Sequence, residues 1–149
     1  RRGTDDDILT IMAAERDLPT LLTTMDPVVR PGAYAYVVAP PGLDPTAVGA
    51  LATVVEPEGT TLVLPLEQAA QLGLHHDGTF GWITLRVHSA LDAVGLTAAV
   101  STALATADIS CNVLAGYHHD HLLVPLAQLD RAMLALQRLG GRRQHTEHQ

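Results

Sequence analysis

Apolar residues recur along the chain with two different spacings. A spacing of two, or a short run of β-branched residues, predicts strands, and these fall at residues 33–39, 52–55, 60–64, 80–88, 109–117 and 121–124. A spacing of three or four predicts helices at residues 8–18, 18–25, 65–74, 95–108 and 126–139. Asp44 followed by Pro45 predicts one more short helix to about residue 51, and residues 30–32 predict a turn. The chain is therefore expected to be α+β.

One stretch of the sequence is repeated. Residues 62–68 (LVLPLEQ) resemble residues 122–128 (LLVPLAQ), and Leu-Asp pairs stand at residues 43–44 and 91–92. The order strand, helix, strand, strand, helix accordingly occurs twice, which is most of a ferredoxin-like fold. We expect two tandem ferredoxin-like (βαββα) units with antiparallel sheets, at residues 18–78 and 79–141. Residues 1–17 are expected to form an N-terminal tail and helix, and residues 142–149 a flexible tail.

Charge and cysteine content narrow the function. The chain has 16 acidic and nine basic residues and a net charge of −7, which argues against binding to nucleic acid or to an anionic membrane surface. A single cysteine, Cys111, excludes a disulfide framework and favours a reducing compartment. The sequence contains neither a secretory signal nor an apolar run of membrane-spanning length. A cytoplasmic protein is expected.

Residue types used by hydrolases do occur, but not in a catalytic arrangement. His88, Ser89 and Asp92 have the types of a catalytic triad, yet neighbours in a strand point to opposite faces, so His88 and Ser89 should not meet. The sequence has no phosphate-binding loop and no dinucleotide fingerprint. Cys111 has no cationic neighbour in the sequence and is expected to be an inert, buried thiol. We therefore expect no catalytic residues, no enzymatic activity and no cofactor.

A cluster of histidines raises the question of a metal. Residues 118–121 contain three histidines and Asp120, and His119 and His121 would share one face of a strand. His75, His76 and Asp77 are the candidates that could complete such a site. The spacing matches no metal motif, so solvated loop histidines are the favoured interpretation, and a metal-dependent hydrolase is kept only as an alternative.

Two longer segments carry a family resemblance. Residues 88–98 (HSALDAVGLTA) and 109–121 (ISCNVLAGYHHDH), after the N-terminal patterns L-x-x-L-L-x-x-M-x-P at residues 18–27 and P-G-x-Y at residues 31–34, resemble ACT domains. The chain is similar to small bacterial tandem-ACT proteins, and to the ACT units of animal cytosolic arginine sensors and of aspartate kinases. The resemblance covers residues 18–139 and implies ACT-type, ferredoxin-like units.

The resemblance also implies a ligand. ACT domains typically bind a free amino acid where two units meet. By similarity to the arginine sensors, Ala90, Ala93, Gly95 and Leu96 would line the end that holds the α-carboxylate and α-amino groups. Gly116, Tyr117 and Asp120 would lie where those sensors hold the ligand side chain. The resemblance assigns no residue of the first unit to the pocket.

The same residues support both a binding and a plainly structural interpretation. The first turn of a helix has free amides that suit a carboxylate, Gly95 permits close approach, and Asp92 can accept hydrogen bonds from an ammonium group. Asp120 can pair with a cationic side chain that Tyr117 covers. Alternatively, Asp92 caps the helix, Gly95 relieves a tight turn and Asp120 is an ordinary turn residue.

We expect a non-catalytic, amino-acid-binding protein with a sensing or regulatory role and an unknown protein partner. The alternative is an ACT-type oligomerisation or docking module without a small ligand. Exposed edges of the sheet would then pair side by side, for instance in a homodimer.

Overall fold

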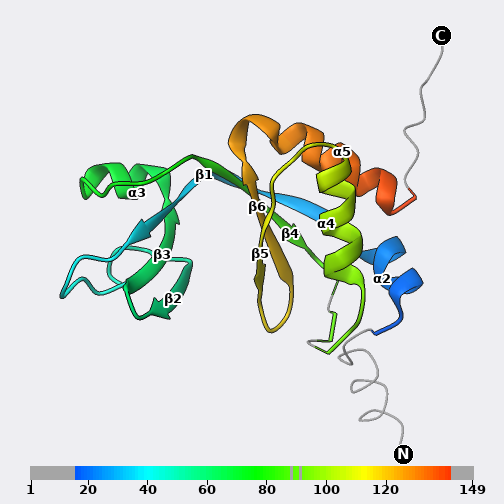
Figure 1. The fold of residues 1–149 in the computed structure, drawn as a ribbon, viewed down its shortest axis with the longest axis horizontal. Coiled ribbons are helices and arrows are strands. Elements are labelled where there is room, and N and C mark those ends of the chain that lie inside the picture. The colour runs from blue at the N-terminus through cyan, green and yellow to red at the C-terminus, as the bar shows by residue number, and fades with distance from the viewer. Residues whose placement is uncertain (1–15, 88, 91, 142–149) are drawn as a thin grey trace, which may run out of the picture.

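The computed structural model describes residues 16–87, 89–90 and 92–141. The strands form one six-stranded sheet. Figure 1 shows that this sheet is twisted and that helices pack against it. The helices are α2 (Leu18–Thr24), α3 (Leu66–Gln71), α4 (Leu96–Thr106), the short 3-10 helix η1 (Leu126–Gln128) and α5 (Leu129–Leu139). The strands are β1 (Pro27–Val38), β2 (Ala52–Glu56), β3 (Gly59–Pro65), β4 (Phe80–Leu85), β5 (Asn112–Ala115) and β6 (Asp120–Pro125). No helix in the described residues is long and apolar enough to cross a membrane.

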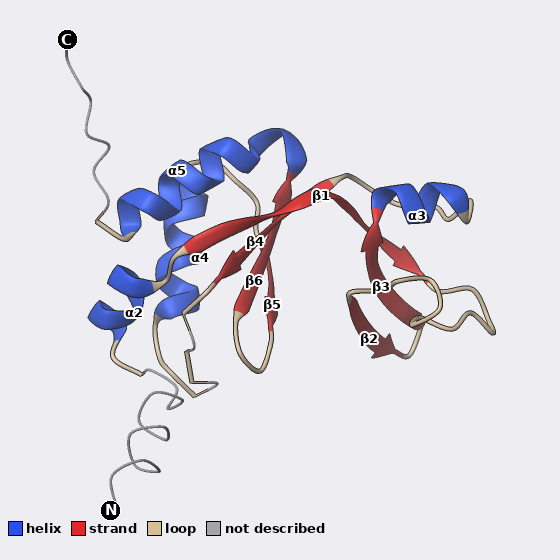
Figure 2. Cartoon of the chain, turned by 180° about the vertical axis from the view of Figure 1, so that it is seen from behind, coloured by secondary structure: helices blue, strands red, loops and turns tan. Residues whose placement is uncertain are grey.

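The sheet has the order β2-β3-β1-β4-β6-β5, and every neighbouring pair is antiparallel. Residues 27–30 of β1 pair with β4, whereas residues 34–38 pair with β3, and a bulge separates the two parts. The turn expected at residues 30–32 is wrong: these residues lie inside β1, in the bulge, where Gly32 adopts a positive φ of 104°. Strand β1 thus joins the two halves of the sheet, as Figures 1 and 2 show.

The registers of the strands confirm the duplication. In β1 and β3, Tyr36 pairs with Val63 and Val38 with Thr61. In β4 and β6 the corresponding pairs are Trp82 with Leu123 and Thr84 with His121. We call residues 34–74 the first half, and residues 18–30 together with 80–139 the second half. The α+β fold with two ferredoxin-like units and an antiparallel sheet is confirmed.

Each half has its own hydrophobic core under its helices. In the second half, Leu21 of α2 and Met25, which follows this helix, pack with residues of β4, β6, α4 and α5. In the first half, Ala69 of α3 packs over β1 and β3. Helix α2 precedes the first half in sequence, yet it packs in the core of the second half. The domain boundary at residue 78 stays a prediction.

A third cluster lies on the opposite, helix-free face of the sheet. It contains Tyr34, Val63, Trp82 and Leu123, with Phe80 beside them. Tyr34 lies edge-on to Trp82 at 5.3 Å between ring centroids, and Tyr36 lies edge-on to Phe80 at 5.2 Å. Tyr117 is the only aromatic residue of the chain outside this face, so nearly all the aromatic content joins the two halves here.

Some predicted elements differ from the structure. The helix expected after Pro45 is wrong: residues 45–49 form turns, Asp44 Oδ1 accepts a hydrogen bond from the Thr46 amide at 3.0 Å, and Gly49 has a φ of 73°. The strands expected at 80–88 and 109–117 are shorter, and the last helix begins with a 3-10 turn. Most of the helix expected at 8–18 lies outside the described residues.

Candidate functional site

The structure brings the two resembling segments together at one end of β4 and β6. Ser89 Oγ donates a hydrogen bond to Asp120 Oδ2 at 3.2 Å. His119 Nδ1 lies 3.4 Å from the carbonyl oxygen of Val87. The loop that follows β4 and leads to α4 is therefore joined to the β5–β6 turn that carries residues 116–119.

Helix α4 begins at this site without a side-chain cap. Gly95 occupies the N-cap position with a φ of 105°, and among the residues that the structure describes no side chain caps the first turn. A Cβ at Gly95 would lie 2.9 Å from Leu18 Cδ2, so both the backbone conformation and the contact favour glycine. The first amides of α4 therefore have no side-chain acceptor, as suits a carboxylate ligand.

Asp92 does not cap α4, and in this respect the structural interpretation of Asp92 is wrong. Its carboxylate Oδ1 lies 3.2 Å from Arg16 Nη2, and both side chains are largely exposed. Three residues separate Asp92 from the first helical residue, Leu96, so the N-cap falls on Gly95.

The remaining predicted residues differ in accessibility. Ala90 and Leu96 are both buried, with 8% and 3% of their surface exposed. Ala93 is half-buried and its amide donates to Ala90 O at 2.9 Å. Tyr117 is 75% exposed at the tip of the turn, and Asp120 is half-buried under the Ser89 hydroxyl. Whether these residues bind a ligand stays a prediction.

Gly116 is required by the turn itself. Its amide donates to His119 O at 2.9 Å, and a Cβ at this position would lie 2.7 Å from the same oxygen. The turn therefore closes tightly only with glycine at this position.

Sequence analysis missed a polar network next to this turn. Trp82 Nε1 donates to Thr84 Oγ1 and to His121 Nδ1, each at 3.2 Å, and the last two atoms lie 3.0 Å apart. The guanidinium of Arg30 lies 5.4 Å from the Trp82 ring centroid. Burial lowers the pKa of His121, His119 and Arg30 act in the same direction, and Asp120 opposes them. If the alternating residues of β4 and β6 had been paired in the sequence analysis, Trp82, Thr84 and His121 would have been placed on one face of the sheet.

The residues considered for catalysis or metal binding do not form such sites in the described part of the chain. His88 lies outside the described residues, and the Ser89 hydroxyl donates to the carboxylate of Asp120. No group of three or more described His, Cys, Asp or Glu residues could hold a metal ion. His75 pairs instead with Asp77 at 3.3 Å, and both are exposed. Burial raises the pKa of the Cys111 thiol, which keeps it protonated and unreactive.

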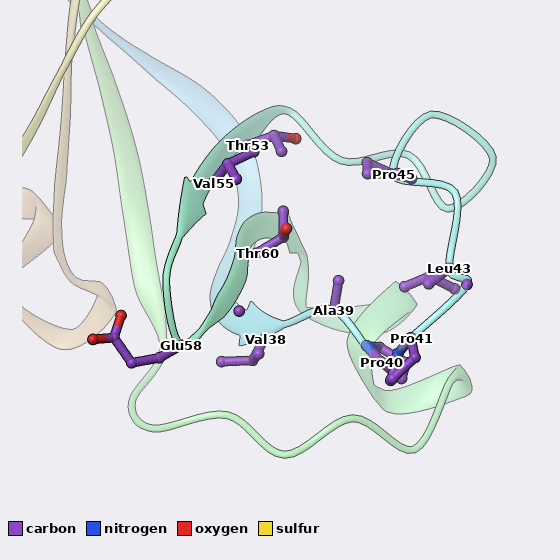
Figure 3. A pocket seen from close by; sticks show the side chains of 12 residues that line it. Val38, Ala39, Pro40, Pro41, Leu43, Pro45, Thr53, Val55, Glu58 and Thr60 are labelled. Carbon is purple, nitrogen blue, oxygen red and sulfur yellow. The ribbon is translucent and has the colours of Figure 1, made fainter.

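The first half has a cavity at the position that corresponds to the predicted site. It has a volume of about 710 Å³ and lies between the loop after β1, strand β2 and the β2–β3 turn. Figure 3 shows Pro40, Pro41 and Pro45 along this loop, with the carboxylate of Glu58 directed away from the loop. Because turns replace a helix after Pro45, this cavity lacks the free helical amides that α4 offers in the second half.

Comparisons with known proteins agree with this architecture. ACT-domain family models match residues 13–81 and residues 79–138. A protein of unknown function from Vibrio cholerae, described as a "possible transport protein", is 44% identical, with a TM-score of 0.75 over 83% of this chain and 95% of that chain. No functionally curated protein matches the chain.

More distant structures share the fold. A protein from Agrobacterium tumefaciens is 20% identical, with a TM-score of 0.64 over 76% of this chain and 87% of that chain. The ligand-free regulatory subunit of aspartate kinase from Thermus thermophilus is 9% identical, with a TM-score of 0.54 over 78% of this chain and 98% of that chain. With two family matches, a shared sheet and a duplicated register, the chain belongs to the ACT-domain family and consists of two tandem ACT domains.

Proposed function

We propose that this protein binds a free amino acid without transforming it and has a regulatory role. The observation that carries the proposal is the Ser89–Asp120 hydrogen bond of 3.2 Å, which joins the loop leading into the uncapped start of α4 to the carboxylate at the start of β6. The likeness in fold to a regulatory subunit of aspartate kinase supports the regulatory part of the proposal.

The chemistry of this site suits a zwitterion with a polar or cationic side chain. The α-carboxylate is held by the free amides at the start of α4, where the helix dipole favours negative charge. Asp92 accepts hydrogen bonds from the α-ammonium group. Asp120 pairs with the side chain of the ligand, and the exposed ring of Tyr117 covers it.

Binding can regulate the protein because the ligand contacts two segments that are far apart in the sequence. A ligand that contacts both the loop after β4 and the β5–β6 turn favours the arrangement in which both are in place, and no bond has to be made or broken. The half-buried single thiol fits a reducing compartment, and we place the protein in the cytoplasm.

Thermal unfolding against the twenty amino acids, each at about 10 mM, tests the proposal. A ligand at 100 times its dissociation constant adds about 2.7 kcal/mol to the free energy of unfolding, which raises Tm by several degrees. Asp120→Asn should abolish the shift. The matched control is Glu58→Gln, which changes a carboxylate in the corresponding turn of the first half and should leave the shift intact. A flat response to all twenty amino acids, or a full shift with Asp120→Asn, would contradict the proposal.

A second candidate function is self-assembly without a small ligand. Strand β2 is an edge of the sheet, and its residues Val54 and Val55 are 48% and 82% exposed. An edge strand of β-branched residues has free backbone groups on its outer side and is suited to pair with another strand. The acidic Glu56 stands only at its end.

A further inference from the structure

The duplicated register allows each side chain of one half to be compared with its counterpart in the other. On the helix-free face of the sheet, Trp82, Thr84 and His121 of the second half correspond to Tyr36, Val38 and Thr61 of the first. Gly32 and Gly78 correspond as well, and both have a positive φ, at 104° and 75°. Each stands two residues before an aromatic residue, Tyr34 or Phe80, that faces the cluster. His76 is the counterpart of Arg30, because the same sequence offset that relates Gly32 to Gly78 separates these two residues.

In the second half, side chains fill this position and satisfy one another. The His121 ring lies 5.4 Å from the Trp82 ring, between centroids. Its Nδ1 accepts from the Trp82 indole at 3.2 Å, and Thr84 Oγ1 completes the network. The indole, the hydroxyl and the imidazole therefore all have hydrogen-bonding partners.

In the first half, smaller side chains leave a cavity at the same position. It has a volume of about 280 Å³ and is lined by Tyr36, Val37, Val38, Thr61, His75, His76 and Asp77. Threonine is much smaller than the histidine that corresponds to it, and tyrosine is smaller than tryptophan. A volume of this size holds a single small ring rather than a drug-sized molecule.

Two polar groups of this cavity have no partner of their own. Within the described residues, neither the Tyr36 hydroxyl nor the half-buried His76 ring makes a hydrogen bond. Tyr36 has the register position that Trp82 has in the second half, and its hydroxyl, like the indole N–H, can donate a hydrogen bond. Burial raises the pKa of Tyr36, which keeps this proton in place at neutral pH.

The charges around the cavity select against an anion. Asp77 lines the cavity with one carboxylate oxygen, Oδ1, 3.3 Å from His75 Nε2, and Glu56 accepts a hydrogen bond from Thr61 Oγ1 at 2.6 Å. An oxyanion would meet these two carboxylates. A neutral ring that accepts one hydrogen bond and donates another fits both the Tyr36 donor and the carboxylate of Asp77.

We infer that the first half contains a binding site for a small nitrogen heteroaromatic ring of the imidazole type. The ring occupies the cavity beside Thr61, as the His121 ring does in the other half. Its unprotonated nitrogen accepts from Tyr36 O–H, and its N–H donates to His76 or Asp77. The site is separate from the proposed amino-acid site, which lies on the loop after β4 and the β5–β6 turn.

Titration of the ¹⁵N-labelled full chain with imidazole at constant pH, followed by amide NMR, tests this inference. A five-atom ring binds weakly, so the titration runs to roughly tens of millimolar. Saturable shifts should appear at residues 36–38, 61 and 75–77. Sodium acetate at the same concentrations should cause none there. Shifts confined to residues 116–121, no saturable shift at all, or acetate binding in place of imidazole would overturn the inference.

Three variants sharpen the test. Tyr36→Phe removes the donor and should weaken imidazole binding about threefold to tenfold. Tyr117→Phe, the matched tyrosine control in the other half, should not change it. Thr61→His places the counterpart side chain in the cavity and should abolish binding. If Thr61→His does not fold, Tyr36→Phe decides alone, and unchanged affinity in that variant overturns the inference.

Discussion

The hydrogen bonds around His121 favour the neutral form of its ring. The indole N–H of Trp82 can only donate, and it is directed at Thr84 Oγ1 and His121 Nδ1, each at 3.2 Å. This contact favours the neutral tautomer in which His121 Nδ1 accepts and the proton is on Nε2. Burial lowers the pKa of His121, because a cationic ring is less well solvated there than in water. A cationic ring would also be unable to accept the hydrogen bond from Trp82 at Nδ1.

The stability of the chain should consequently fall in mild acid. The pKa of His121 lies below the unfolded value of about 6.5, so the unfolded chain takes up its proton first as the pH falls. The contribution of His121 is complete above that value and is lost as the pH falls towards the folded pKa. Urea unfolding at about pH 7.5 and 5.5 measures the loss.

Two variants assign this pH dependence to His121. His121→Asn keeps an acceptor near the Nδ1 position but does not titrate, so it should show a smaller loss between the two pH values. His75→Asn changes an exposed histidine and should keep the loss of the unaltered chain. An identical pH dependence in His121→Asn and the unaltered chain would show that other groups cause it.

Single residues also show where sequence patterns reach their limit. Gly95 was predicted to be the first residue of a helix at 95–108, and the structure makes it the N-cap, with a φ of 105°. The sequence could not show that Leu18 packs against it, because the 2.9 Å approach depends on how α2 lies over α4. Asp92 was compatible with either capping or ligand binding, and the structure excludes only the first.

At the scale of elements, two similar sequence signals lead to different structures. Asp17 with Pro19 begins α2, where Asp17 Oδ2 accepts from the Thr20 amide at 3.1 Å. Asp44 with Pro45 begins only turns. Helix α2 buries an apolar face in the core of the second half, whereas residues 45–49 bury only Val48. A short helix gains most of its stability from such packing, which the local signal does not contain.

The packing of α2 leads to a prediction about Leu21. This side chain is fully buried among residues of the second half, so Leu21→Ala should lower the free energy of unfolding by about 2–5 kcal/mol, measured in urea. Leu72→Ala, at a 39% exposed leucine after α3, should cost less than about 1 kcal/mol.

Hydrogen exchange shows where that stability is lost. Because Leu21 packs with α4 and α5, their amides should lose protection in Leu21→Ala before those of α3 do. Earlier loss in α3 would mean that α2 supports the first half instead.

At the scale of the whole molecule, β1 and β4 bind the two ACT domains into one sheet. Residues 27–30 of β1 add a strand beside β4, and Tyr34 pairs with Phe80 where the halves meet. The edges of the sheet are therefore β2 and β5, one from each domain. Of these, β2 has the exposed valines, which makes it the edge suited to a second copy.

Self-assembly through β2 predicts a dimer that one charge can dissociate. Val55→Lys places a cation on the edge and should give a monomer by size-exclusion chromatography with light scattering, since lysine is a common protector of edge strands. Val94→Lys is the control, because Val94 is 84% exposed and Val55 82%, but Val94 lies beside α4. A monomeric unaltered chain at all concentrations from about 1 to 100 μM would rule out this assembly.

Much of the fold could be derived from local patterns. Spacing and turn residues predicted α2, the β2–β3 hairpin, α4 and α5, and the match of residues 62–68 to 122–128 predicted the duplication. These patterns are visible in the sequence because each element buries one face at regular spacing. The repeated pattern is visible because both cores require apolar residues at corresponding positions.

The sequence by itself thus determined the class of fold, its repetition and the segments of the proposed site. Only the tertiary structure decided that β1 serves both halves, that α2 packs under the second, and that Ser89 meets Asp120. It also decided that a histidine fills one half where the other has a cavity. The physical reason is the same in each case: these contacts join residues far apart in the chain, and local spacing does not specify which elements lie side by side.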